Sequence, residues 1–328
     1  MDSIAYTSGN ERKKLFIEAA DKTGITDSII EKDFWVSWIL GKIFSKKNLS
    51  KILCFKGGTS LSKAFSLIDR FSEDIDLILS KHIILKDDEI LEQPSNSKQA
   101  NFNREIEIRA NHFILTTLKN EIARALGTTC EVSSDPKYNG ILFVKFPRVF
   151  DYSYVQPDIK LEVGPLALWD PNEKYPISSF IASSLPELNL ENPIIPTVKP
   201  ERTFWEKITI LHHEHHRPET SPLSSRYSRH YYDIFKIGNS AIKYKALANF
   251  KLLEEVVAFK KRFYPRGWAN YNNAFPGTIR LYPAKQNLHD LEQDYLKMKK
   301  MIFGSAPRWK EILDYLKVLE NEINKSKS

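Results

Sequence analysis

Apolar runs with strand periodicity and amphipathic helical patterns follow one another early in the chain. Residues 51–55 form a short, mostly apolar run that ends at two glycines, which is typical of a buried strand entering a tight turn. Apolar residues then recur with helical spacing at Leu61, Ala64, Phe65 and Ile68. Residues 74–79 carry hydrophobic side chains at 75, 77, 78 and 79. The pattern therefore predicts a strand, a glycine turn, a helix and a second strand in succession.

The remaining patterns divide the chain into a mixed part and a helical part. Helical patterns cover residues 10–48 and 101–126, and strand patterns cover 140–149 and 158–163. The Pro-rich residues 166–198 predict an extended connection without regular structure. Helical patterns resume at 200–211 and 224–237. We therefore expect an α/β (α+β) fold: a small mixed sheet with N-terminal helices at 1–165, and a helical C-terminal subdomain at 199–328.

Candidate chemistry lies in the glycine turn and the strand that follows its helix. The turn Gly57-Gly58, with Thr59 or Ser60 as the cap of the helix, exposes backbone N–H groups that favour a phosphate. Strand periodicity puts Asp74 and Asp76 on one face, about 6.6–6.8 Å apart. Two carboxylates so placed repel each other unless a cation lies between them, and their hard oxygens suit Mg²⁺ or Mn²⁺. These residues predict metal-dependent phosphoryl transfer.

The two motifs together carry a family resemblance. Residues 55–61 and 70–77, with fifteen residues between Gly58 and Asp74, resemble the AbiEii/MenT-like nucleotidyltransferase toxins of toxin–antitoxin and phage-defence systems, a branch of the DNA polymerase β-like superfamily. The resemblance implies a polymerase β-like nucleotidyltransferase core that uses an NTP with Mg²⁺ or Mn²⁺. It also implies an RNA acceptor, such as the tRNA 3′ end, and a cognate antitoxin. The glycine turn, Arg70 and Ser72 would then contribute to nucleotide binding.

Enzymes of this superfamily use a third acid to complete the metal site. In residues 158–163 the alternation sends Ile159, Leu161 and Val163 to one face and the charged side chains to the other. If this strand returns beside the Asp-x-Asp strand, it brings a third carboxylate to the metals. The resemblance and the alternation together favour Glu162, with Asp158 as the alternative.

Two later residues match positions implicated in the activity of the same toxin family. Lys207 lies in the helical pattern after Pro200, and Asp233 lies in the pattern at 224–237. Lys207 would neutralise charge on the phosphates of the nucleotide, and Asp233 would orient Lys207 or an arginine. The alternative is that the two form an ion pair that only fastens the C-terminal helices.

Composition limits the protein class without fixing the acceptor. The 328 residues have 42% hydrophobic and 27% charged residues and no signal-peptide or membrane-span pattern, so we expect a cytoplasmic protein. The net charge of +7 suits a nucleic acid or mere solubility. A strip of cations and aromatics from Lys260 onward could stack unpaired bases or simply pack. The histidines at 212–216 predict a solvated helix end, with a metal shared by His212 and His216 as the alternative.

These motifs leave the acceptor open. The same chemistry could move a nucleotide or a phosphate onto a protein hydroxyl. A non-catalytic RNA-binding protein with a relic site is a further alternative.

Overall fold

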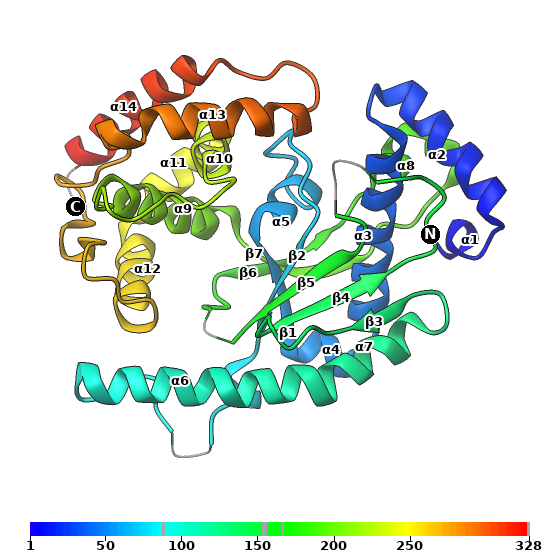
Figure 1. Cartoon of the computed structure of the whole chain (residues 1–328), viewed down its shortest axis with the longest axis horizontal. Coiled ribbons are helices and arrows are strands. Elements are labelled where there is room, and N and C mark those ends of the chain that lie inside the picture. Colours follow the sequence, from blue (N-terminus) through cyan, green and yellow to red (C-terminus); the bar gives the residue numbers. More distant parts are fainter. Residues whose placement is uncertain (87–88, 153–155, 166, 327–328) are drawn as a thin grey trace. The chain divides into compact units, whose positions relative to one another are not determined.

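The computed structural model describes residues 1–86, 89–152, 156–165 and 167–326, which form two compact units. The first unit comprises residues 1–65, 71–93 and 100–198, and the second comprises 66–70, 94–99 and 199–328. Figure 1 shows the ribbon of both units with their elements labelled.

A seven-stranded mixed sheet forms the centre of the first unit. Its strands are β1 (Leu53–Lys56), β2 (Ile75–Leu79), β3 (Glu131–Ser133), β4 (Ile141–Lys145), β5 (Ile159–Gly164), β6 (Asn172–Pro176) and β7 (Ile194–Val198). Their order is β3-β4-β5-β2-β1-β7-β6. The pairs β2–β5 and β1–β7 are parallel, while the others are antiparallel. The predicted mixed α/β fold class is confirmed.

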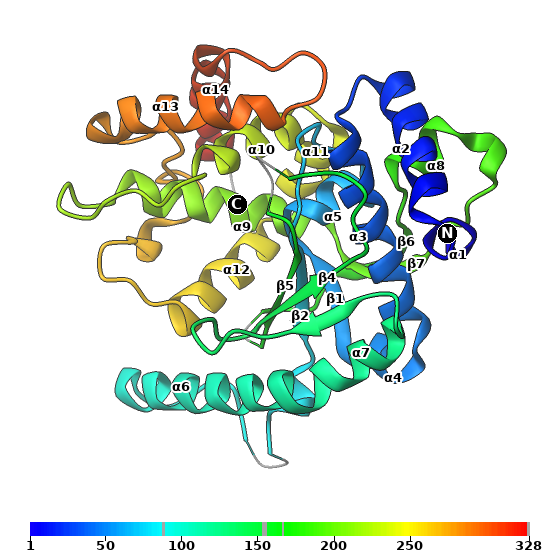
Figure 2. The ribbon, with the colours of Figure 1, turned by 45° about the vertical axis from the view of Figure 1, so that its right-hand side comes forward.

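Helix α3 has more buried residues than any other described helix of the first unit. The helices of this unit are α1 (Asp2–Ala5), α2 (Gly9–Thr23), α3 (Asp27–Ser45), α4 (Lys47–Ile52), α5 (Gly57–Lys63), α7 (Lys119–Leu126), α8 (Phe180–Ser184) and most of α6 (Asn96–Phe113). Helices α2 and α8 pack on α3, and α3 also contacts β7 (Figure 2). A capping box between Ser8 and Glu11 starts α2. Because α3 is covered on several sides, it buries a long apolar run that includes Trp35 and Trp38.

Helix α5 is shorter than its apolar pattern predicted. It ends at Lys63, and Ser66 has a positive φ of 51°, so Ile68 lies beyond the helix. The expected helix at 101–126 is observed as α6 and α7, joined by a π-helical turn at Ile114–Leu118. It ends at Gly127, as predicted.

The Pro-rich residues 166–198 are not the extended connection that the sequence predicted. They contain β6, α8 and β7, and β7 lies inside the sheet between β1 and the edge strand β6. The prolines are compatible with strands here because Pro176 ends β6, which lies at the edge of the sheet. Pro196 lies within β7 itself, next to Thr197, which is the register partner of Phe55 in β1.

The second unit is helical. Its helices are α9 (Pro200–His215), α10 (Ser228–Gly238), α11 (Ala241–Leu247), α12 (Phe250–Phe263), α13 (Leu288–Met298) and α14 (Trp309–Lys325). Pro200 occupies the first turn of α9, where its missing N–H costs nothing. Helix α9 packs against α10, α11 and α12, and α10 also packs against α13 and α14. Among the described residues, none of the helices combines the length and apolarity needed to cross a membrane.

Candidate active site

The parallel pairing of β2 with β5 brings the predicted acidic residues side by side. Asp76 lies directly opposite Glu162 in the register, and Ile75 lies opposite Leu161. Asp74 precedes Ile75 just as Lys160 precedes Leu161. Because side chains alternate along a strand, Asp76 and Glu162 share the face that Asp74 and Lys160 also approach. The predicted return of the 158–163 strand beside the Asp-x-Asp strand is therefore observed.

Gly57 allows the backbone of the turn to approach Asp76 closely. Its φ is +83°, a conformation that L residues with a side chain rarely adopt. A Cβ at this position would lie 1.9 Å from Asp76 Oδ2 and 2.7 Å from its Cγ. Lys56 of β1 also pairs with Asp76 in the antiparallel register with β2. The glycine turn and the Asp-x-Asp strand are thus one structural unit.

The acidic residues affect one another electrostatically. Burial raises the pKa of Asp74, and the nearby carboxylates of Glu73 and Glu162 raise it further. Lys160 forms an ion pair with Glu162 and interacts favourably with Asp74 and Asp76. A group of negative charges that a cation stabilises therefore lies on this face of the sheet.

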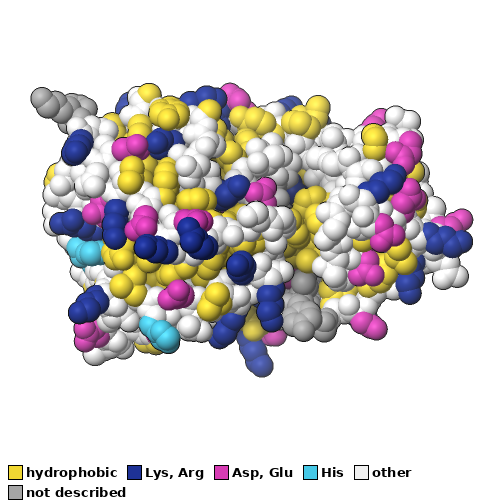
Figure 3. Space-filling model, turned by 90° about the horizontal axis from the view of Figure 1, so that it is seen from above, with side chains coloured by type: hydrophobic (Ala, Val, Ile, Leu, Met, Phe, Trp, Pro, Cys, Tyr) yellow, Lys and Arg dark blue, Asp and Glu magenta, His cyan; other side chains and the backbone are white. Residues whose placement is uncertain are grey.

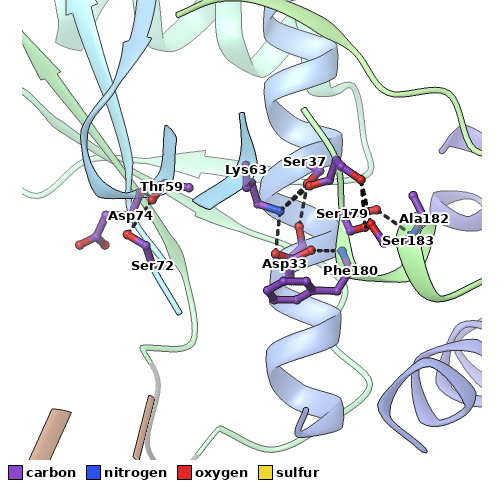
Figure 4. A network of polar contacts seen from close by, with 11 residues as sticks. Asp33, Ser37, Thr59, Lys63, Ser72, Asp74, Ser179, Phe180, Ala182 and Ser183 are labelled. Atoms are coloured by element: carbon purple, nitrogen blue, oxygen red, sulfur yellow. Dashed lines mark hydrogen bonds and ion pairs between the residues drawn. The ribbon is translucent and has the colours of Figure 1, made fainter. Parts of the chain in front are cut away.

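Thr59 and Ser72 connect α5 to the start of β2. The Thr59 hydroxyl donates to Ser72 Oγ at 2.9 Å and contacts the Asp74 carbonyl, as Figure 4 shows. Ser60 Oγ donates to the Gly57 carbonyl at 2.8 Å. These hydroxyls hold the turn against the acidic strand. Their predicted role in nucleotide binding stays a prediction, and in this arrangement it would fall to the backbone N–H groups of the turn.

A buried ion pair supports the residue that precedes Asp74. Lys32 of α3 is fully buried and contacts Glu73 at 2.9 Å, and it also donates to the Gln156 carbonyl. Glu73 accepts a further hydrogen bond from the Gln156 N–H at 3.2 Å. The charge of Lys32 also acts on Asp74 and Asp158. This ammonium therefore compensates negative charge at the entry to β2.

A second buried pair anchors the end of α5. Lys63 donates to Asp33 Oδ1 at 2.6 Å and to Ser37 Oγ at 2.7 Å, and Asp33 Oδ2 accepts from the Phe180 N–H at 2.7 Å (Figure 4). Residues 31–33 are all buried, although a run of three charges in a helix would ordinarily face solvent. The sequence offers only a weak signal for this, because their partners lie far along the chain.

The acidic residues fit the donor chemistry of a hard divalent cation. Asp74, Asp76 and Glu162 offer carboxylate oxygens from two neighbouring strands. Asp158 precedes the first residue of β5, so the register favours Glu162 over Asp158 as the third acid. Within the described ranges, no group of three or more His, Cys, Asp or Glu side chains is already arranged to hold a metal ion. Binding would therefore require side chains to turn toward a common centre.

The second unit contains a separate cluster of buried charges around Asp233. Arg70 donates to both carboxylate oxygens of Asp233, from Nε at 2.7 Å and from Nη2 at 2.8 Å. Lys207 Nζ lies 2.8 Å from Asp233 Oδ2 and 3.4 Å from His230 Nδ1. Burial alone would raise the pKa of Asp233, but Arg70 and Lys207 hold it well below its ordinary value. The predicted Lys207–Asp233 contact is observed. A role in catalysis stays a prediction.

Burial also affects the other titratable groups of this cluster, Lys207 and His230. Burial lowers the pKa of Lys207, which Asp233 opposes, and burial also lowers the pKa of His230 well below its usual range. An aspartate that holds two cations at once fixes their position strongly, because each charge is buried with a partner.

The first two histidines of the run at the end of α9 are buried, and within the part of the chain that the structure describes the run is not arranged as a metal site. His212 is fully buried; its Nε2 lies 3.0 Å from the Asn270 carbonyl, and its Nδ1 accepts from the Arg280 N–H at 3.1 Å. With both ring nitrogens hydrogen-bonded, His212 has no lone pair for a metal. Burial lowers its pKa to about 4. The prediction of a solvated helix end is therefore wrong for His212 and His213, whereas His215 and His216 are partly exposed.

We expect Gly57→Ala to destabilise the first unit more than Gly24→Ala does. Both glycines have positive φ, but a Cβ at Gly24 would have no heavy atom within 4 Å, whereas at Gly57 it would collide with Asp76. Gly24→Ala should cost about 1–2 kcal/mol of unfolding free energy, and Gly57→Ala about 2–5 kcal/mol. Urea denaturation of both variants measures the difference. Equal losses would show that the turn does not press on Asp76.

We expect Asp233→Asn to lower the unfolding free energy by about 3–5 kcal/mol, because it leaves two buried cations without their anion. The matched control is Asp69→Asn, which breaks the exposed Asp69–Lys236 pair of the same unit and should cost less than about 1 kcal/mol. Because the folded-state pKa of Asp233 lies below its ordinary 3.8, the stabilisation is present above about pH 4. It is lost as the pH falls further. Urea denaturation at pH 7 and pH 3 tests this, and similar losses in both variants would contradict it.

The family described as "Nucleotidyl transferase AbiEii toxin, Type IV TA system" matches residues 38–315. A search of curated proteins finds no match. The solved structures similar to this chain include JHP933 from Helicobacter pylori, at 13% identity over 90% of this chain and 92% of that one, with a TM-score of 0.45.

Two further solved structures have comparable similarity. The nucleotidyltransferase toxin MenT4 from Mycobacterium tuberculosis has 16% identity over 94% of this chain and 98% of that one, with a TM-score of 0.41. A putative nucleotidyltransferase from H. pylori has 14% identity over 89% and 93%, with a TM-score of 0.44. The family match covers most of the chain, including β1, α5, β2, β5, α9 and α10. This chain therefore belongs to the AbiEii nucleotidyltransferase toxin family and is a nucleotidyltransferase.

Proposed function

We propose that this nucleotidyltransferase uses Mg²⁺ or Mn²⁺ to transfer a nucleoside monophosphate from an NTP to an RNA acceptor, such as the tRNA 3′ end. It would act as the toxin of a toxin–antitoxin or phage-defence system. The observation that carries this proposal is the β2–β5 register, in which Asp76 lies opposite Glu162 with Asp74 two residues away on the same strand segment. Membership of a toxin–antitoxin family implies an NTP substrate and an antitoxin partner.

Asp74, Asp76 and Glu162 are the residues we assign to the metal. Their oxygens are the donors that Mg²⁺ and Mn²⁺ prefer. A divalent ion bound between the carboxylates would relieve their mutual repulsion. When bound, the ions would lower the pKa of the acceptor hydroxyl and neutralise charge on the departing pyrophosphate. Gly57 leaves room beside Asp76 and keeps the backbone of the turn free of side-chain atoms.

Arg70, Lys207 and Asp233 belong to the proposal through the resemblance to the toxin family. The support from the structure is that Asp233 binds both cations at hydrogen-bond distance, which holds their charge in a defined position. Cations so held can offset negative charge on a triphosphate without reorganising. The same contacts would also fasten α10 to α9, so a stability measurement must accompany any activity measurement on these residues.

The choice of an RNA acceptor rests on the family resemblance and on charge. The net charge of +7 and the isoelectric point near 9.1 favour a polyanionic partner. Figure 3 shows Lys and Arg side chains in several groups on one face, with hydrophobic side chains between them. In the predicted basic and aromatic strip, Lys261, Tyr264 and Arg266 are exposed. Trp268 instead stacks against Arg217 and Arg266, at 4.8 and 5.6 Å from its ring centroid, which favours a packing role for that residue.

A transfer assay tests the reaction and its acceptor together. We expect purified protein to label total tRNA from one of the four labelled NTPs when Mg²⁺ or Mn²⁺ is present, and not when EDTA replaces the metal. Asp76→Asn should lower the rate by more than about 100-fold, because it removes a metal ligand rather than a group that supports one. Asp290→Asn, at an exposed position on α13, is the matched control and should retain full rate.

Parallel reactions with a protein fraction in place of tRNA identify the acceptor. Label in protein alone would overturn the RNA acceptor while leaving the transfer chemistry intact. Absence of transfer with every NTP, or full activity of the Asp76→Asn variant, would overturn the proposed function.

A further inference from the structure

The side chain of Lys160 lies on the same face of β5 as that of Glu162. Lys160 is two residues before Glu162 on β5, and the alternating burial of this strand puts both side chains on the less buried face. Its ammonium forms an ion pair with Glu162 and interacts electrostatically with Asp74 and Asp76. Three carboxylates therefore interact with the ammonium of Lys160, which comes from the same sheet.

This position differs from that of two buried lysines of the first unit. Lys32 and Lys63 have side chains that are 0% and 4% exposed and are held by several hydrogen bonds, so they are fixed parts of the interior. The Lys160 side chain is 31% exposed, and that of its partner Glu162 is 41% exposed. A lysine with a flexible stem and an exposed side chain can leave its partner without leaving a buried charge behind.

We propose that Lys160 is a tethered counterion: its ammonium stabilises Asp74, Asp76 and Glu162 in the metal-free protein and leaves when a divalent ion binds there. This inference rests on the proposed function, because it assumes that these three acids are the metal ligands. The ammonium and the metal compete for the same negative charge, so Lys160 lowers the affinity for the metal. It also prevents the three acids from repelling one another when the metal is absent.

The geometry distinguishes this role from an ordinary surface ion pair. A surface pair joins one cation to one anion and contributes little to stability. Lys160 interacts with three carboxylates, and two of them, Asp76 and Glu162, are fixed opposite each other by the strand register. Removing the lysine therefore increases the net negative charge of the group while leaving every carboxylate in place. Metal affinity should rise, whereas the loss of a metal-binding side chain would make it fall.

Mn²⁺ binding to the purified full-length chain, measured by isothermal titration calorimetry without nucleotide, tests this. We expect Lys160→Met to bind Mn²⁺ about tenfold more tightly than the unmodified chain, since removing a unit charge near a divalent ion is worth at least that much at partly exposed sites. Lys160→Arg keeps the charge and should stay near the unmodified affinity. The control Lys145→Met removes an exposed lysine from the neighbouring strand β4, opposite Glu131, and should leave the affinity unchanged.

Thermal unfolding of the same proteins gives a second readout that needs no activity. Without metal, Lys160→Met should unfold at a lower temperature than Lys145→Met, and saturating Mn²⁺ should remove the difference. Equal or weaker Mn²⁺ binding by Lys160→Met, with intact binding by the unmodified chain, would overturn the role of Lys160 alone. If neither protein binds Mn²⁺, or if Asp76→Asn binds it as well as the unmodified chain does, the proposed metal site fails and the inference fails with it.

Discussion

Repulsion between carboxylates on paired strands is the constraint on which the candidate site depends. The register that joins β2 to β5 sets Asp76 opposite Glu162, with Asp74 close to both. Such an arrangement costs free energy in an isolated protein unless positive charge compensates it. The first unit supplies that charge from two directions: Lys160 on the sheet face and Lys32 beneath the entry to β2. Because its carboxylates repel one another, the site favours the binding of a further cation.

The helices behind the site hold its backbone in place. Helix α3 contributes both Lys32, which pairs with Glu73, and Asp33, which pairs with Lys63 at the end of α5. Its buried charges thus fasten the start of β2 and the end of α5, the helix that begins at Gly57. Gly57 completes the arrangement, because its lack of a side chain lets the turn contact Asp76. The backbone conformation of Gly57 and the buried charges of Lys32 and Asp33 together determine where the acidic side chains lie. In the second unit, Asp233 holds the side chains of Arg70 and Lys207 in place.

The local patterns of the sequence predicted the elements of the site, but not the contacts that support them. Alternation along a strand is a local property, so the shared face of Asp74 and Asp76 and the facing of Glu162 could be expected from the sequence. The burial of Glu31, Lys32 and Asp33 could not, because a run of three charges gives no indication that its hydrogen-bond partners come from residues thirty or more positions away. Strands β6 and β7 were missed because prolines obscured their periodicity. The role proposed for Lys160 could not be predicted from the sequence, because it depends on the register of β5 against β2.

The central claim is that the acids of β2 and β5 together bind divalent metal. A crystal structure of the protein grown with Mn²⁺, with anomalous differences recorded near the manganese edge, tests it most directly. The account predicts an anomalous peak about 2.1–2.2 Å from carboxylate oxygens of Asp74, Asp76 and Glu162, with the Lys160 ammonium withdrawn from Glu162. Manganese bound elsewhere, or no peak while the Lys160–Glu162 pair stays intact at saturating Mn²⁺, would contradict it.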